Sequence, residues 1–218
     1  MSIDTRTTTG SAPGSTAYQA DAGYYDQRTR LFQHWREMLV QQLSVGVGDT
    51  VLDVGCGTGL CLPGLLQKVG PSGTVVGVDA SRDMLDLASK RVADNGWTNV
   101  QLINSPIETA PINAVLNGVA ADAALFCAVH DVMQSPSAMT NVFEQLRPGA
   151  AVAAIGGKWP SPWLWPLRPW VTDLHAPFIT DFTGFDRPWR QLAEHIPDLQ
   201  IRQLGAGTGY LAYGRTPE

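Results

Sequence analysis

Glycines and carboxylates with a distinctive spacing follow two β-prone segments of this chain. The first segment leads into Asp53 and then into a turn with three glycines in alternate positions, 55 to 59. Glycine adopts backbone angles closed to other residues and lets a ligand lie directly against the main chain. The second segment, 74–78, ends in Asp79, and a carboxylate in that place can accept hydrogen bonds from two ribose hydroxyls. The pattern predicts a site for a nucleoside-containing ligand.

A second group of residues that could do chemistry is the pair His130 and Asp131, which follows the β-prone segment 122–127. Open α/β sheets bind their ligands at the carboxyl ends of the strands, where this pair is expected. Histidine titrates near neutrality and can remove a hydroxyl proton. Asp131 could act as a base or attract a cationic amine. The alternative is that His130 caps the following helix or packs there, without proton transfer.

Alternating strands and helices must position these residues. Apolar residues recur at helical spacing between positions 31 and 43, and Ser81 is a suitable N-cap for a helix over 83–95. Alternation of this kind predicts an α/β fold, with a parallel sheet covered by helices on both faces. The expected strands after the first are 74–78, 100–104, 122–127 and 150–155, and the other expected helices are 61–69 and 136–146.

Two motifs give the chain a family resemblance. VLDVGCGTG at 51–59, followed by VVGVDAS at 75–81, resembles the first two motifs of class I S-adenosylmethionine (SAM) dependent methyltransferases. The resemblance runs from about Tyr24 to Ile155 and is closest to the small-molecule branch that includes the ubiquinone/menaquinone C-methyltransferases. It implies a Rossmann-like, doubly wound, mostly parallel sheet with an antiparallel C-terminal edge hairpin near 199–204 and 210–213. A plain NAD-binding Rossmann domain is the alternative.

The resemblance implies that SAM is the cofactor and binds over the glycine loop. Asp53 is expected to orient its amino group, and Asp79 is expected to accept hydrogen bonds from its ribose. Pro106 stands where the family usually has an acid for the adenine amino group, so Ser105 or the backbone of Ile107 is expected to serve instead. The full set of expected cofactor contacts is Tyr25, Asp53, Gly55, Cys56, Gly57, Gly59, Asp79, Ala80, Met84, Ser105, Ile107 and Cys127.

The regular alternation ends at the segment 158–189, which follows the fifth strand and holds five of the seven tryptophans and six of the fifteen prolines. Prolines this dense prevent a long regular helix. We expect an aromatic substrate cap, because rigid aromatic rings exclude water and accommodate flat, apolar molecules. A space-filling cap, a dimer contact or a membrane-interface contact are the alternatives. The side chains expected to contact the acceptor are Tyr24, Lys158, Trp163, Trp170 and His175.

Length and composition limit the number of domains, the partners and the cellular compartment that the protein can have. The 218 residues suit one domain, 17–218, after a tail, 1–16, whose Thr, Ser, Gly and Pro content predicts disorder. A net charge of −5 without a basic run disfavours nucleic acid as a partner. Three cysteines without spaced pairs indicate reduced thiols in a cytoplasmic protein, and we expect no metal site. No apolar run is long enough to insert stably into a membrane.

These observations predict an enzyme that transfers a methyl group from SAM to a small, largely apolar or aromatic molecule. Oxygen or nitrogen is expected as the acceptor atom ahead of carbon, and a homodimer is left open. Two alternatives remain. One is a catalytically inactive protein that binds SAM or S-adenosylhomocysteine and acts as a regulatory partner. The other is a SAM-dependent enzyme that does not transfer a methyl group.

Overall fold

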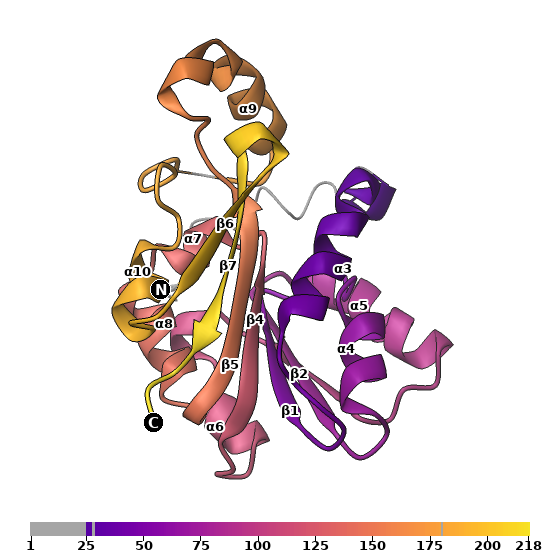
Figure 1. The fold of residues 1–218 in the computed structure, drawn as a ribbon. Helices are drawn as coiled ribbons and strands as arrows, with labels where there is room; N and C mark the ends of the chain where they lie inside the picture. Colours follow the sequence, from indigo (N-terminus) through magenta and orange to yellow (C-terminus); the bar gives the residue numbers. More distant parts are fainter. Residues whose placement is uncertain (1–24, 28, 180) are drawn as a thin grey trace, which may run out of the picture.

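The computed structural model describes residues 25–27, 29–179 and 181–218, and its strands form one mixed sheet. The seven described strands lie in the order β3-β2-β1-β4-β5-β7-β6. The first five run parallel, whereas β7 runs antiparallel to both of its neighbours (Figure 1). This arrangement confirms the predicted parallel sheet with an antiparallel C-terminal edge hairpin. The expected tail, 1–16, and Tyr24 lie outside the described residues.

Most strand and helix bounds agree closely with those expected from the sequence, but β5 begins at Leu146 instead of 150, and the helix expected over 136–146 ends at Phe143. The strands are β1 (Thr50–Val54), β2 (Thr74–Asp79), β3 (Val100–Asn104), β4 (Ala121–Cys127), β5 (Leu146–Gly157), β6 (Gln200–Leu204) and β7 (Gly209–Arg215). The described α-helices of four residues or more are α3 (Gln33–Gln42), α4 (Leu62–Val69), α5 (Arg82–Asp94), α6 (Ile112–Val115), α7 (His130–Met133), α8 (Pro136–Phe143), α9 (Arg168–His175) and α10 (Arg190–His195). Short 3₁₀ segments include η1 (Arg30–Phe32), η2 (Ile107–Thr109), η3 (Pro162–Leu167) and η4 (Gly205–Gly207).

Both faces of the sheet are buried, which explains why its central strands carry apolar residues on both faces. Leu52 and Val76 pack into the core on one face, whereas Val51 and Val75 pack into the core on the other. Successive strand residues point to opposite faces, so an uninterrupted apolar strand requires a covering layer on each side. The helices supply those layers, and the fold is doubly wound as predicted.

The carboxyl ends of the parallel strands meet at one edge of the sheet. The glycine loop follows β1, Asp79 ends β2, Cys127 ends β4 and Gly157 ends β5. Beyond β5 the chain enters the segment 158–189, where α9 spans eight residues and has a proline in its first turn. Figure 1 shows α9 beyond the end of β5, at the edge where α3 also begins. In the described part of the chain, no helix is both long and apolar enough to cross a bilayer.

Candidate active site

The glycine loop after β1 exposes its backbone to an open space. Gly55 and Gly57 have φ angles of +67° and +53°, in the left-handed region that favours glycine. A Cβ atom on Gly55 would lie 2.3 Å from the Val129 side chain, so that position has no room for one. A Cβ on Gly57 would meet no described atom within 4 Å. Gly55 therefore allows close packing against Val129, which precedes α7, whereas Gly57 leaves a surface on which a ligand can lie.

Asp79 connects the end of β2 to this loop. Its two carboxylate oxygens accept hydrogen bonds from the backbone N–H groups of Gly57 and Ser81, each at 2.8 Å. Burial raises the pKa of Asp79, and these two backbone donors oppose that effect. A carboxylate oxygen can accept more than one hydrogen bond, so Asp79 keeps acceptor capacity for ligand hydroxyls.

Asp53 is a buried carboxylate beneath the loop. It is 1% exposed, and neither of its side-chain oxygens has a hydrogen-bond partner among the described residues. Burial, and to a smaller extent the neighbouring Asp79, raises the pKa of Asp53 to about 7. An unpaired buried carboxylate at this place favours a cationic group above the loop. Together with the open surface at Gly57 and the carboxylate of Asp79, it fits a ligand with an ammonium group and a ribose.

A cavity of about 450 Å³, hereafter the larger cavity, lies at this edge of the sheet. Eight of the twelve expected cofactor residues line it: Tyr25, Gly55, Gly57, Asp79, Ala80, Met84, Ile107 and Cys127. The other four, Asp53, Cys56, Gly59 and Ser105, are not among its described lining residues. The cavity wall also includes Pro106 and Glu108, whose Oε1 accepts a hydrogen bond from Ser135 Oγ at 2.8 Å. Glu108 thus has a carboxylate two residues after Pro106, the position at which the family usually has an acid for the adenine amino group.

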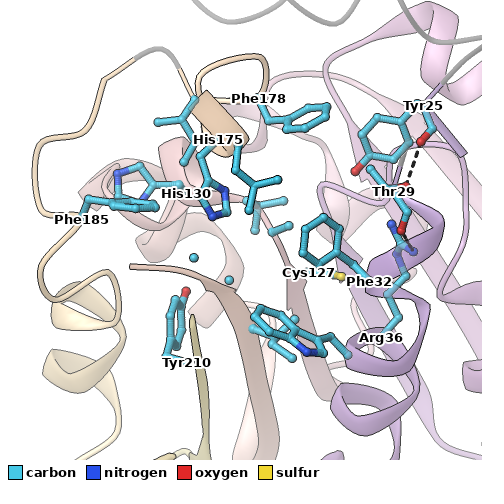
Figure 2. Close-up of a pocket in the computed structure, with 18 residues that line it drawn as sticks. Tyr25, Thr29, Phe32, Arg36, Cys127, His130, His175, Phe178, Phe185 and Tyr210 are labelled. Carbon is cyan, nitrogen blue, oxygen red and sulfur yellow. Dashed lines mark hydrogen bonds between the residues drawn. The ribbon is translucent and has the colours of Figure 1, made fainter. Parts of the chain in front are cut away.

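A second cavity of about 80 Å³, hereafter the smaller cavity, lies beside the first. Its wall combines the start of the described chain, the ends of β4 and β5, and the segment 158–189. Figure 2 shows its side chains, with aromatic rings on several sides. Five residues line both cavities: Tyr25, Cys127, Ala128, Val129 and His130. The two cavities are therefore neighbouring compartments with a shared wall.

His130 in the shared wall is held in one tautomer. The ring is 8% exposed, and its Nε2 lies 3.0 Å from the carbonyl oxygen of Thr183. A carbonyl can only accept, so Nε2 donates and the neutral ring leaves Nδ1 unprotonated. Nδ1 is buried without a hydrogen-bond partner in the described structure. Burial lowers the pKa of His130, although the Thr183 carbonyl and Asp131 partly oppose this. The result is a neutral imidazole with a free lone pair, suited to accept a proton.

The segment 158–189 brings a second histidine to the smaller cavity. Phe185 packs edge-on against His130 and His175, with ring centroids 5.1 and 5.3 Å apart. Burial first, and His130 second, lower the pKa of His175 to about 4, so its ring stays neutral near pH 7. A Cβ atom on Gly157 would lie 2.3 Å from His175 Nε2, so the end of β5 has room for this ring because Gly157 has no side chain.

Other acceptor residues expected from the sequence lie elsewhere. Trp163 and Trp170 are 77% and 57% exposed and are not among the described residues that line either cavity. Lys158 is buried, and its ammonium donates to the carbonyls of Trp159 and Gly207 at 2.7 and 2.9 Å. The segment lines the smaller cavity with the expected His175 and with four residues that were not among the expected contacts, Leu174, Phe178, Ile179 and Phe185. Asp131 lines the larger cavity.

The first described residues are tied to the glycine loop by a polar cluster that the sequence did not reveal. Asp26 accepts a hydrogen bond from Thr58 Oγ1 at 2.5 Å and forms an ion pair with Arg91 of α5, also at 2.5 Å. Arg91 Nε donates to the Thr58 carbonyl at 3.0 Å. These contacts hold the neighbouring Tyr25 at the shared wall, where its ring packs edge-on against Phe178 at 5.8 Å. The described chain start and the segment 158–189 therefore meet over the two cavities.

Fold and site together define a class of protein, the class I SAM-dependent methyltransferases. A solved SAM-dependent methyltransferase from Aquifex aeolicus has the same fold, with a TM-score of 0.61 and 19% identity over 90% of this chain and 97% of that one. A family model described as a methyltransferase domain matches residues 46–156, so the chain belongs to this methyltransferase family. It is a SAM-dependent methyltransferase, which confirms the expected fold, enzyme class and cofactor.

Curated relatives include two bacterial enzymes named demethylmenaquinone methyltransferase. The Lactococcus lactis protein is 25% identical over 195 residues, which covers 82% of this chain and 72% of that protein. The Lactobacillus johnsonii protein is 42% identical over 76 residues, which covers 33% of this chain and 31% of that protein. The chain therefore spans less than a third of the length of the Lactobacillus johnsonii protein in the matched region.

Proposed function

We propose that this enzyme methylates a small hydroxylated aromatic ring, of quinol type, that binds in the smaller cavity. The observation that carries the proposal is the shared wall, in which His130, whose buried Nδ1 has no described hydrogen-bond partner, lines both a cofactor-sized cavity and an aromatic one. SAM supplies an electrophilic methyl group when it is bound. The protein contributes alignment, exclusion of water and a base.

The proposed role of His130 is to remove the hydroxyl proton of the ring. Its Nε2–H is fixed by the Thr183 carbonyl, so Nδ1 is the atom that accepts the proton. Loss of that proton puts negative charge on the oxygen and on the ring carbons ortho and para to it, which makes these atoms better nucleophiles. Asp131, which follows His130 and opposes the lowering of its pKa, would stabilise the imidazolium that forms.

We propose a ring carbon as the acceptor atom, in place of the oxygen or nitrogen that the sequence favoured. Support comes from the relatives, whose names specify demethylmenaquinone, a quinone. In the reduced form of such a ring, the carbon next to the phenolate oxygen carries part of its charge. Methylation at that carbon replaces a hydrogen, which leaves as a proton, so the ring regains its aromaticity.

The apolar wall of the smaller cavity supports a flat ring as the acceptor. Phe178 and Phe185 from the segment 158–189 face this cavity together with Phe32 and Trp35 from the described chain start. Large rigid rings exclude water and lose little conformational entropy when they contact a ligand. We therefore propose that this segment is the acceptor cap, and that its cavity-lining residues, rather than its exposed tryptophans, contact the acceptor.

The test uses naphthohydroquinone under reducing conditions with SAM that carries an isotope-labelled methyl group. We expect S-adenosylhomocysteine to form, and the nuclear magnetic resonance shift of the labelled methyl to be that of a methyl on an aromatic carbon. A methoxy shift would contradict the ring carbon and restore oxygen as the acceptor. Absence of turnover with naphthohydroquinone and other hydroxylated arenes would contradict the proposed acceptor class.

A further inference from the structure

A buried arginine in the smaller cavity has no counter-charge among the residues that the structure describes. Arg36 of α3 is 7% exposed and lines this cavity. Its Nη1 donates to the carbonyl of Thr29 at 3.0 Å and to Gln33 Oε1 at 3.4 Å. The Tyr25 hydroxyl also shares a hydrogen bond with the guanidinium, which lowers the pKa of Tyr25 against the larger raising effect of burial. All of these partners are neutral, and no described carboxylate forms an ion pair with Arg36.

A cation in this position is costly unless something offsets its loss of hydration. Arginine stays protonated in proteins, so it cannot avoid the cost by releasing a proton. Buried charges are usually paired, and a pair stabilises the fold only when its geometry and hydrogen bonds are good. The guanidinium is a planar fork of donors that matches anionic oxygens. An arginine against this cavity, without a counter-charge among the described residues, therefore points to an anionic group on the ligand.

The position of Arg36 shows which end of the ligand would carry that group. Figure 2 shows Arg36, Thr29 and Tyr25 on one side of the cavity, with His130 and Phe185 on the opposite side. Arg36 lines the smaller cavity and is not among the described residues of the larger one, whereas His130 lines both. A ring with one end at His130 would therefore direct its other end towards Arg36, away from the cofactor compartment.

We infer that Arg36 is the binding residue for an anionic oxygen, phenolate or carboxylate, that the aromatic acceptor carries at the end remote from His130. The inference rests on the proposed function in that it takes the smaller cavity as the acceptor site. A charge-assisted hydrogen bond in a dry, aromatic site is shorter and stronger than one between neutral groups. Arg36 thereby selects acidic aromatic acceptors over neutral rings of the same shape.

The first test uses para-nitrophenol, whose neutral and ionised forms absorb at different wavelengths, with the protein saturated with S-adenosylhomocysteine. We expect the bound dye to ionise at a pH about one unit or more below that of the free dye, because a cation within contact favours the anion. Arg36→Gln should abolish the shift, and Arg36→Lys should retain part of it. Arg82→Gln, which changes an exposed arginine of α5, is the matched control and should leave the shift intact.

The second test distinguishes the two sources of the anion by displacing the dye with benzoate or with the neutral, isosteric benzamide. A wild-type preference for benzoate of about tenfold or more, lost in Arg36→Gln, identifies a carboxylate site. A dye shift without that preference identifies a phenolate site. Equal ionisation of the bound dye in wild type and Arg36→Gln, or failure of wild type to bind either anion, overturns the inference.

Two further measurements separate a loss of anion binding from misfolding and from failure of the proposed function. Retained SAM affinity and an unchanged circular dichroism spectrum show that Arg36→Gln is folded, and Arg36→Lys gives a folded comparison if Arg36→Gln is not. Turnover of naphthohydroquinone by the wild type tests the proposed function by itself. An enzyme that methylates that ring but shows no Arg36-dependent shift overturns the anion site and leaves the proposed function standing.

Discussion

The two cavities are built from different parts of the chain. The larger one is lined at strand ends by the backbone of Gly55 and Gly57 and by Asp79. The smaller one is lined largely by side chains from two segments outside the parallel core, the described chain start and the segment 158–189. The sheet therefore dictates the cofactor compartment, whereas the acceptor compartment depends on how two peripheral segments pack. We expect variants in the two compartments to affect different measured quantities.

The largest expected effect lies in the shared wall. His130→Ala should reduce turnover by about a hundredfold or more, because it removes the atom placed to accept the acceptor proton. SAM affinity, measured by calorimetry, should stay near the wild-type value. His34→Ala, which changes an exposed histidine of α3, should leave both quantities unchanged. Nearly full turnover by His130→Ala would mean that alignment alone supports transfer.

The pH dependence of turnover separates His130 from an ordinary histidine. Burial lowers the pKa of His130 below 6.5, so the ring stays neutral and active as the pH falls from 7 through that value. Below its folded-state pKa the ring binds a proton, and kcat/KM should fall by about tenfold per pH unit. An acid limb at or above pH 6.5 would contradict this assignment. The limb should be absent from the residual activity of His130→Ala.

Asp79 tests the cofactor compartment separately. Asp79→Ala removes both carboxylate acceptors and leaves the N–H groups of Gly57 and Ser81 without that partner. SAM affinity should fall by at least about tenfold, since a hydrogen bond to a charged group contributes roughly 1.5–3 kcal/mol. Calorimetry measures this directly, with the exposed Asp83→Ala as the control. An unchanged affinity in a folded variant would contradict the ribose-binding role of Asp79.

The smallest expected effects compare two aromatic residues of the segment 158–189. Phe178 lines the smaller cavity, whereas Trp163 is 77% exposed. Phe178→Ala should raise the KM for the acceptor by about two- to tenfold, since an aromatic contact contributes roughly 0.5–1.5 kcal/mol. Trp163→Ala should change it by less than about twofold. The reverse order would restore the acceptor role that the sequence suggested for Trp163.

The fold and the cofactor compartment could be predicted because their signals are local. Alternating apolar segments, the glycine spacing and the acid at the end of β2 each lie within a few consecutive residues. The sheet then fixes where the strand ends meet, so eight of the expected cofactor residues fall around one cavity. Asp53 is almost fully buried and is not among the described residues that line that cavity.

The acceptor compartment could not be predicted in the same detail, because its contacts join distant parts of the chain. Arg36 occupies a polar position in a helical pattern, and its burial depends on packing that local spacing does not encode. Thr183 fixes the tautomer of His130 through its backbone carbonyl. Every residue has such a carbonyl, so the residue type at position 183 does not predict this contact. In the segment 158–189, the sequence predicted Trp163, Trp170 and His175 as acceptor contacts. Tertiary packing places His175 at the cavity together with phenylalanines and leaves the two tryptophans exposed.

The shared wall has a consequence for the energetics of binding. Tyr25 and His130 line both cavities, and Asp26 ties the neighbouring backbone to Thr58 of the glycine loop. A ligand in one cavity therefore contacts part of the wall of the other. Thermodynamic linkage makes any such coupling reciprocal, so the factor by which SAM changes acceptor affinity equals the factor by which the acceptor changes SAM affinity. An inhibitor of the smaller cavity would accordingly have two dissociation constants, one with the cofactor bound and one without, and their ratio would measure that coupling.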